Sequence, residues 1–195
     1  MGREGDAIVQ QGLAEIGDRV QIRDARIEDG RVVLDVLQVG PEDGMCCPTQ
    51  LATRTFAMQG GGLVETSTEV VGTASLATLE GREWVLRKLS STEAAPAEPE
   101  VTLTIDGDRL AGSSGCNRYN GTIKTGETAT SLAVGPLATT RMACPPEVMT
   151  LEQRYTTALQ SANAWAFRFR RLSISYGEGE TFGNLLFEAR AAPAR

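Results

Sequence analysis

Residues 115–126 read GCNRYNGTIKTG, and residues 141–149 read RMACPPEVM. The first stretch places Cys116 among glycine, asparagine and tyrosine, and the second supplies Cys144 directly before two prolines. Prolines suit the start of a helix, and apolar residues recur at helical spacing over residues 148–162. These stretches predict a strand near Cys116, a helix after Cys144, and two cysteines that could form a metal site, a reactive centre or a disulfide.

Short alternating segments surround the predicted helix. An Asp-Gly turn at residues 106–107 joins two strands, and Trp165, Phe167 and Phe169 share one strand face ahead of a turn near Arg170 and Arg171. Further strands are expected at residues 84–88, 171–176 and 184–189, and one or two short strands within residues 129–140. The second half of the chain is therefore predicted to be α+β, mostly antiparallel sheet with one packed helix.

The first half carries only strand patterns. Residues 20–36 alternate around a Glu-Asp-Gly turn, and two more strands follow at 51–58 and 63–70, which predicts a β-meander. Thr, Ser, Ala and Gly over residues 66–79 indicate a linker or a domain seam, and prolines and glutamates over residues 90–100 indicate a mobile loop. We expect a small all-β domain over residues 1–75 and an α+β domain over 76–195.

Composition excludes several functions. The net charge of −6 argues against a nucleic-acid partner, and no stretch approaches the roughly 20 apolar residues of a membrane span. The chain has no histidine, which removes Ser/His and Cys/His nucleophile pairs and histidine-dependent zinc sites. The one dense basic run is RFRR, residues 168–171, where a solvated strand face is favoured over an anion or lipid-headgroup site.

The second half resembles the META domain, the family of the HslJ-like heat-shock lipoproteins of bacterial envelopes. The matching residues are LEGREWVL (79–86), GSSGCNRYNGTI (112–123), the stretch 132–159 and the strands through LLFEA (185–189). Residues 15–65, with their GDRV start and CCPT, resemble the LppP/LprE-type bacterial lipoprotein segment. These resemblances imply a periplasmic, cell-surface or secreted location and a role in stress tolerance. The amino terminus lacks a signal-peptide pattern, so we expect an export signal upstream.

An oxidising envelope compartment would favour disulfide bonds among the four cysteines. Cys116 and Cys144 belong to one motif set and one domain, so a structural disulfide is favoured over buried free thiols. Cys46 and Cys47 are adjacent and could form a strained, redox-responsive vicinal disulfide, although ordinary thiols or a loop-pinning bridge are favoured. The spacing does not suit an all-cysteine zinc site, so no metal and no other cofactor is predicted.

Asn117, Tyr119 and Arg141 could line a small polar pocket, although structural hydrogen bonding is the favoured use. No catalytic residue is identified. The sequence thus predicts a non-enzymatic envelope or secreted protein that binds an envelope protein or a small ligand, or serves a structural role. The alternative is a redox-sensitive thiol protein that uses Cys46 and Cys47.

Overall fold

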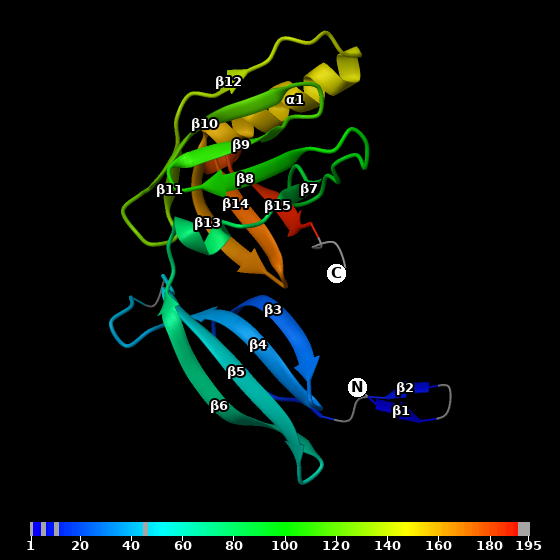
Figure 1. The fold of residues 1–195 in the computed structure, drawn as a ribbon, viewed down its shortest axis with the longest axis vertical. Coiled ribbons are helices and arrows are strands. Elements are labelled where there is room, and N and C mark those ends of the chain that lie inside the picture. The colour runs from blue at the N-terminus through cyan, green and yellow to red at the C-terminus, as the bar shows by residue number, and fades with distance from the viewer. Residues whose placement is uncertain (1, 5–6, 10–11, 45–46, 191–195) are drawn as a thin grey trace. The chain divides into compact units, whose positions relative to one another are not determined.

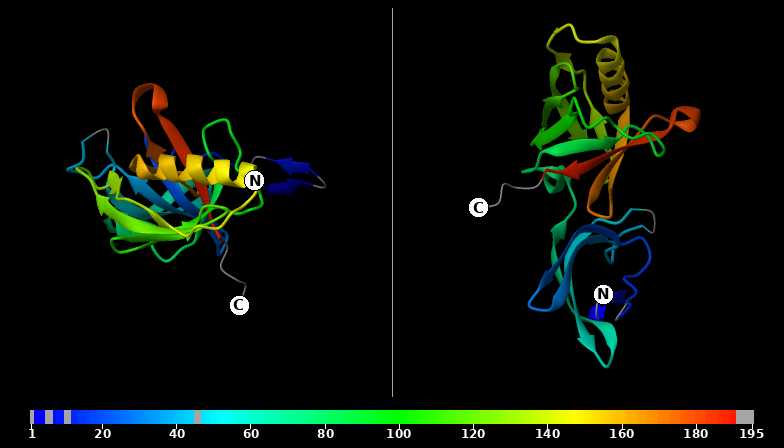
Figure 2. Two further views of the ribbon diagram at one scale, coloured as in Figure 1. Left: turned by 90° about the horizontal axis from the view of Figure 1, so that it is seen from above. Right: turned by 90° about the vertical axis from the view of Figure 1, so that its right-hand side faces the viewer.

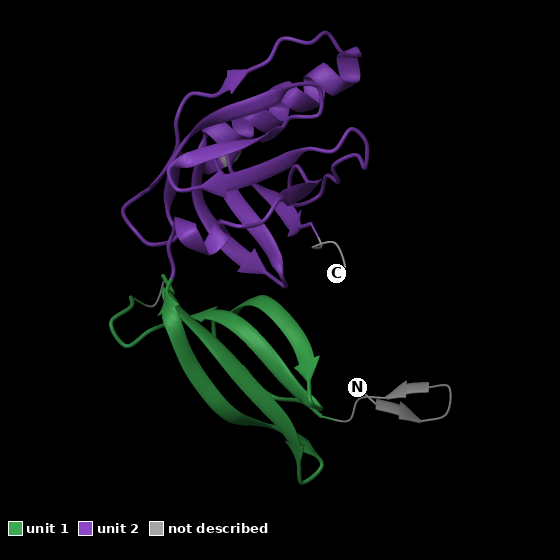
Figure 3. Cartoon of the chain, viewed as in Figure 1, with its two compact units in different colours: residues 1–73 green, residues 74–195 purple. Residues whose placement is uncertain are grey.

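The computed structural model of the chain describes residues 2–4, 7–9, 12–44 and 47–190. Two units emerge, residues 1–73 and residues 74–195 (Figure 3). The sequence places the boundary between residues 75 and 76.

The first unit contains a four-stranded antiparallel sheet in which each strand pairs with the next along the chain, which confirms the predicted β-meander (Figure 1). The strands are β3 (Gln21–Glu28), β4 (Arg31–Gln38), β5 (Gln50–Gln59) and β6 (Gly62–Thr73), and a separate hairpin joins β1 (Gly2–Glu4) to β2 (Ala7–Val9). Asp29 and Gly30 form the two-residue turn between β3 and β4, both with positive φ.

Strand β6 overturns the linker alternative for residues 66–73, whereas the boundary between the two units lies after residue 73, within the predicted stretch 66–79. Residues 66–73 pair with β5 through a register that runs from Gln59 opposite Gly62 to Gln50 opposite Thr73. The β-branched threonines and valines of this stretch favour a strand. Its side chains are exposed, so it lacks the apolar alternation that identifies a half-buried strand.

One face of this sheet holds a small apolar core. Leu34 and Val36 of β4 lie two residues apart and pack with Ala52 and Phe56 of β5. The spacing follows the two-residue period of a strand, which sends alternate side chains to the same face. The core of the first unit is therefore built mainly on its two central strands.

The second unit is a curved antiparallel sheet with the order β11-β10-β9-β8-β7-β15-β14-β13, and β12 pairs with β10. The strands are β7 (Trp84–Lys88), β8 (Thr102–Asp106), β9 (Arg109–Ser113), β10 (Arg118–Thr125), β11 (Leu132–Val134), β12 (Ala138–Thr139), β13 (Ala162–Arg168), β14 (Arg171–Tyr176) and β15 (Gly183–Ala189). Short 3-10 turns lie at η1 (Leu76–Leu79) and η2 (Gly179–Thr181). The two ends of the sheet meet where Ser131 bridges Ala164 and Trp165 N donates to the Thr130 carbonyl, so the sheet is nearly a barrel.

Helix α1 (Pro146–Gln160) packs on the inner side of this sheet. It begins at the second proline, as predicted, with Glu147 in its first turn, where a negative charge favours the helix dipole. The Tyr155 ring contacts Tyr119 on β10 and Phe187 on β15, strands that lie four places apart in the sheet order. Figure 2 shows the helix between the green strands and the orange and red strands. The sheet therefore curves around α1, and the predicted α+β class is confirmed.

Two further expectations need revision. Phe169 does not continue the buried face of β13; it lies in the turn between β13 and β14 and is 84% exposed. The turn comes one residue earlier than predicted because Arg168 pairs with Arg171. Residues 90–100 form a loop, but Leu89 N donates to the Glu93 carbonyl and Ala95 N to the Arg87 carbonyl. These bonds fasten the start of the loop to the end of β7.

Candidate functional site

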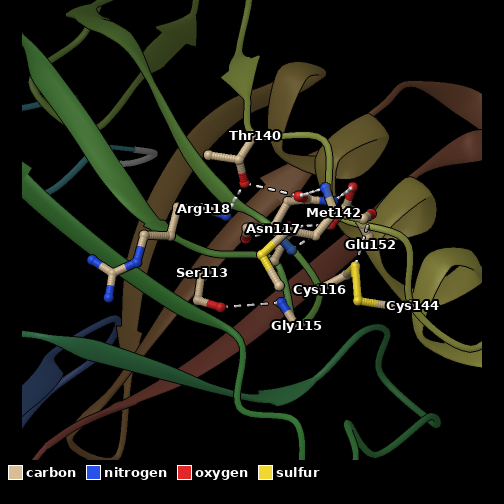
Figure 4. The surroundings of a disulfide bond; sticks show 10 residues. Ser113, Gly115, Cys116, Asn117, Arg118, Thr140, Met142, Cys144 and Glu152 are labelled. Atoms are coloured by element: carbon tan, nitrogen blue, oxygen red, sulfur yellow. Dashed lines mark hydrogen bonds between the residues drawn. A yellow bond between two sulfur atoms is a disulfide. The ribbon is translucent and has the colours of Figure 1, made fainter.

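The family motif surrounds a disulfide bond. Cys116 lies in the tight loop between β9 and β10, and Cys144 lies in the segment that leads into α1 (Figure 4). Their sulfur atoms are 2.00 Å apart and their Cα atoms 5.9 Å apart, so the predicted disulfide is present. It connects the β9–β10 loop covalently to the start of the helix.

A hydrogen-bonded network lies directly beside this bond. Glu152, on α1, accepts bonds from the Ser114 hydroxyl at 2.6 Å, from Asn117 N at 2.9 Å and from Asn117 Nδ2 at 3.0 Å. The Asn117 side-chain oxygen accepts from the Thr140 hydroxyl at 2.8 Å and from Met142 N at 2.7 Å. Asn117 is 5% exposed and Ser114 is fully buried. We call this network and the adjacent disulfide the clamp, because together they join the β9–β10 loop, the segment before α1 and α1 itself.

A second polar contact between strand and helix lies deeper in the core. The Tyr119 hydroxyl lies 2.6 Å from the Tyr155 hydroxyl and 2.7 Å from the Thr102 carbonyl oxygen. Burial raises the pKa of both phenols above the ordinary value of 10.0. Both hydroxyls therefore remain protonated in the folded protein, and they bond to each other and to the sheet.

Gly112 makes this contact sterically feasible. It lies on β9 directly opposite Tyr119 on β10. A Cβ atom at this position would lie 2.0 Å from the Thr102 carbonyl oxygen and 2.8 Å from the Tyr119 hydroxyl. Gly112, the first glycine of the motif, is therefore required because the Tyr119 side chain crosses β9 at this position to reach Thr102 on β8.

The structure does not gather the three predicted pocket residues around one cavity. Asn117 is part of the clamp, Tyr119 is part of the buried tyrosine pair, and Arg141 is exposed. Cys46 lies outside the described residues, so its pairing with Cys47 stays a prediction. Within the described ranges, no group of three His, Cys, Asp or Glu side chains is placed to hold a metal ion.

The outer side of the same strands forms a hollow of about 630 Å³. Strand β10 turns Tyr119 inward and presents Arg118 and Asn120 to the outside, as the two-residue period requires. The remaining lining residues come from β8, β9 and the ends of neighbouring strands: Glu83, Glu100, Thr102, Thr104, Ala111, Gly112, Ser113, Tyr119 and Arg190. The motif thus supplies an internal framework and one wall of an external depression.

The charges of the hollow are partly paired. Arg190 donates to Glu100 at 2.7 Å and also bonds to Glu83. The hydrogen bond from Arg190 lowers the pKa of Glu100, which holds that carboxylate ionised. Arg118 is exposed, and no carboxylate of the described residues forms an ion pair with it. The hollow therefore presents one guanidinium without an ion pair among the described residues, beside hydroxyl and amide groups and beside the partly exposed ion pairs of Arg190 with Glu83 and Glu100.

Sequence reasoning missed Glu152, although a signal for it exists. Val148, Glu152, Tyr155 and Leu159 follow the spacing of one helix stripe, and this glutamate interrupts an otherwise apolar pattern. A carboxylate in such a position needs hydrogen-bond donors, and the Ser114 and Asn117 groups supply them.

The second unit is thus a nearly closed antiparallel sheet that packs against one face of a single helix, with a disulfide clamp between them. The META domain family model matches residues 77–188, more than half of the 195 residues, so the chain belongs to the META domain family. The match leaves residues 15–65 uncovered, and their LppP/LprE-type resemblance stays a prediction. No curated protein matches the chain.

Two solved structures are similar to this chain. One is an NMR structure of a protein from Burkholderia xenovorans, 25% identical, with a TM-score of 0.47; the match covers 65% of this chain and 97% of that chain. The other, also an NMR structure, is 19% identical with a TM-score of 0.46; the match covers 59% of this chain and 94% of that chain.

No helix of the described residues combines the length and the apolar character that crossing a membrane needs.

Proposed function

We propose that this META domain protein is a non-enzymatic module of the bacterial cell envelope or of the secreted fraction, and that it binds its partner through the hollow outside β8, β9 and β10. The clamp is the observation that carries the proposal. Its polar side chains bond to one another, and its two thiols are oxidised. Structural disulfides persist in oxidising compartments, which supports a location outside the cytoplasm.

The non-enzymatic part rests on how the motif side chains are used. Both side-chain groups of Asn117 are engaged, and both buried tyrosines are protonated and bonded. A nucleophile or general base needs a free lone pair close to a substrate position. The Ser114, Asn117 and Glu152 side chains of the clamp are used in hydrogen bonds within the protein, so we assign the clamp the role of a scaffold.

The hollow has the chemistry of a polar binding surface. The Arg118 guanidinium suits a carboxylate or phosphate oxygen, while Asn120 and the threonine and serine side chains suit hydroxyl groups. A small ligand or partner group that carries an anion next to hydroxyls, such as a sugar acid, would satisfy both. Such an assignment also accounts for an exposed arginine beside the motif that has no ion-pair partner in the described part of the chain.

A titration monitored by NMR tests the binding part. Isotope-labelled protein is titrated with glucuronate, and with glucose as the uncharged control. We expect glucuronate to shift backbone amides of β8, β9 and β10, Arg118→Gln to weaken this response, and Arg141→Gln to leave it unchanged, since Arg141 is exposed outside the hollow. Shifts confined to other strands, or the same response in Arg118→Gln, would contradict the assignment.

Thiol trapping in intact cells tests the location. A maleimide carrying a polyethylene glycol chain is added before and after reduction, and the shift in electrophoretic mobility is recorded. We expect Cys116 and Cys144 to react only after reduction. Reaction of both thiols before reduction would place the protein in a reducing compartment and overturn the envelope assignment.

A redox role of Cys46 and Cys47 remains the alternative function. The same trapping experiment on a Cys116→Ala/Cys144→Ala variant isolates this pair and reports whether it cycles with the redox state of the cell.

A further inference from the structure

The hairpin between β13 and β14 ends in an unusual turn. Arg168 pairs with Arg171, and the two residues between them, Phe169 and Arg170, have φ values of 48° and 67°. Two-residue turns with positive φ at both positions favour Asn-Gly, Asp-Gly or Gly-Gly. The two other turns of this kind in the described chain follow the rule, with Asp-Gly at residues 29–30 and Gly-Gly at 60–61.

The Phe169 side chain contributes little to the fold. A bulky residue at positive φ is strained, and Phe169 is 84% exposed, so it does not gain the core packing that its neighbour Phe167 obtains at 4% exposure. An exposed aromatic ring held in a strained backbone conformation is a feature from which function can be inferred. This tip, residues 168–171, is therefore a candidate contact surface.

The charges at the tip destabilise the hairpin rather than stabilise it. Arg168 and Arg171 lie directly opposite each other across the two strands, and like charges in that position are destabilising. Arg171 donates to Glu188 at 2.7 Å, but Arg87 shares that carboxylate at 3.0 Å. No carboxylate of the described residues forms an ion pair with Arg168. Arg168 and Arg171 thus place more positive than negative charge at the tip, on a chain with a net charge of −6.

We propose that this tip binds the surface of an anionic phospholipid membrane, with the Phe169 ring in the interfacial region and the arginines of residues 168–171 on lipid phosphate groups. Guanidinium groups bind phosphate oxygens with two hydrogen bonds, and basic clusters are attracted to anionic leaflets. A protein partner fits the tip less well. Stable protein interfaces bury about 800 Å² on each side, which a convex two-residue turn cannot offer, whereas a fluid lipid surface adapts to a small protrusion.

Phe169→Asn/Arg170→Gly is the most informative variant. It installs Asn-Gly, the sequence that this turn geometry favours, so we expect the thermal unfolding midpoint to stay the same or rise. In sedimentation with vesicles of equimolar phosphatidylglycerol and phosphatidylcholine, we expect its partitioning to fall about fiftyfold, roughly tenfold from the ring and fivefold from the arginine. A loss of binding with a gain in stability cannot be attributed to unfolding.

A matched pair of charge variants separates the tip from net charge. Arg168→Gln/Arg170→Gln removes two positive charges from the tip, and Arg109→Gln/Lys124→Gln removes two from other exposed positions. We expect about 25-fold weaker partitioning for the first pair and a much smaller change for the second. Equal losses in the two pairs would overturn the proposal, because they would show a nonspecific effect of charge.

Two further measurements test whether binding requires anionic lipid and whether residue 169 enters the lipid interface. Wild-type protein is expected to sediment with the phosphatidylglycerol vesicles but not with phosphatidylcholine alone, and to dissociate when salt rises from about 0.05 M to about 0.5 M. A Phe169→Trp variant is expected to show a blue-shifted emission on the anionic vesicles. Failure of wild type to bind these vesicles, unchanged Trp emission, or capture of an acidic protein without vesicle binding would each refute the membrane assignment.

Discussion

Removing the hydroxyl of Tyr119 should destabilise the protein more than removing that of Tyr155, because the hydrogen bonds of this buried pair have a defined direction. The Thr102 carbonyl can only accept, so the single hydroxyl proton of Tyr119 points to it. The Tyr155 hydroxyl must then donate to the Tyr119 oxygen. Removing the Tyr119 oxygen leaves a buried donor and a carbonyl without this contact. Removing the Tyr155 oxygen leaves the Tyr119 donation intact.

The free-energy costs follow from this direction. Tyr119→Phe should reduce the free energy of unfolding by about 3 kcal/mol, since an unsatisfied buried polar group costs about 1–3 kcal/mol and the Thr102 carbonyl also loses its donor. Tyr155→Phe should cost only about 1 kcal/mol, the net value of one hydrogen bond. The double variant should cost about 2 kcal/mol, because it no longer buries an unpaired Tyr155 hydroxyl.

Urea unfolding of the four proteins, followed by tryptophan fluorescence, measures these differences. The informative quantity is the effect of Tyr155→Phe in the two backgrounds, destabilising in wild type and stabilising in Tyr119→Phe. Slopes of the unfolding curves should agree, so that midpoints report stability. If Tyr155→Phe costs as much as Tyr119→Phe, or if the double variant is the least stable, the assigned direction is wrong.

Four further predictions concern the same region. Cys116→Ala/Cys144→Ala should lower the free energy of unfolding by about 3.6 kcal/mol through the loop that the bond closes, measured in urea without reductant. Gly112→Ala should cost about 1–3 kcal/mol because its Cβ would overlap a backbone carbonyl, whereas Gly62→Ala, where a Cβ meets its nearest atom at 3.8 Å, tests the loss of a strand glycine without that overlap. Asn117→Asp should cost about 3 kcal/mol by placing a second carboxylate against Glu152, and adding Glu152→Gln should recover part of that loss in the same assay. Because burial raises the pKa of both tyrosines, the unfolded chain deprotonates first; stability should be full below about pH 10 and fall above it by up to about 1.4 kcal/mol per pH unit for each tyrosine, which unfolding curves across alkaline pH would show.

Local signals in the sequence were sufficient for most elements of the fold. The helix start at Pro146, the Asp29-Gly30 turn and the meander depend on residues close together in the chain, where capping, turn chemistry and periodicity act. The near-closure between Ser131 and Ala164 depends on contacts between distant segments. No pattern within either segment specifies its partner, so the curvature of the sheet around α1 could not be predicted.

The candidate site was predictable only in part, for a similar reason. Family resemblance indicated the bond between Cys116 and Cys144, and the structural use of Asn117 agrees with its buried hydrogen bonds. The partner of Asn117 is Glu152, which lies 35 residues later on another element. The hollow depends on which strands become neighbours, so the grouping of Arg118 with Arg190 could not follow from spacing in the sequence.

Adjacent residues at the start of β10 point alternately to the clamp and the buried tyrosine pair on one side and to the hollow on the other. Asn117 and Tyr119 face the helix, while Arg118 and Asn120 face the hollow. The clamp fixes the strand from the inside, so the positions of the outward side chains depend on bonds that no ligand touches. Arg118 N itself donates to the Thr140 hydroxyl, which also donates to the Asn117 side chain. Loss of the clamp should therefore disorder the Arg118 wall of the hollow, whereas replacement of the Arg118 side chain alone should leave the fold intact.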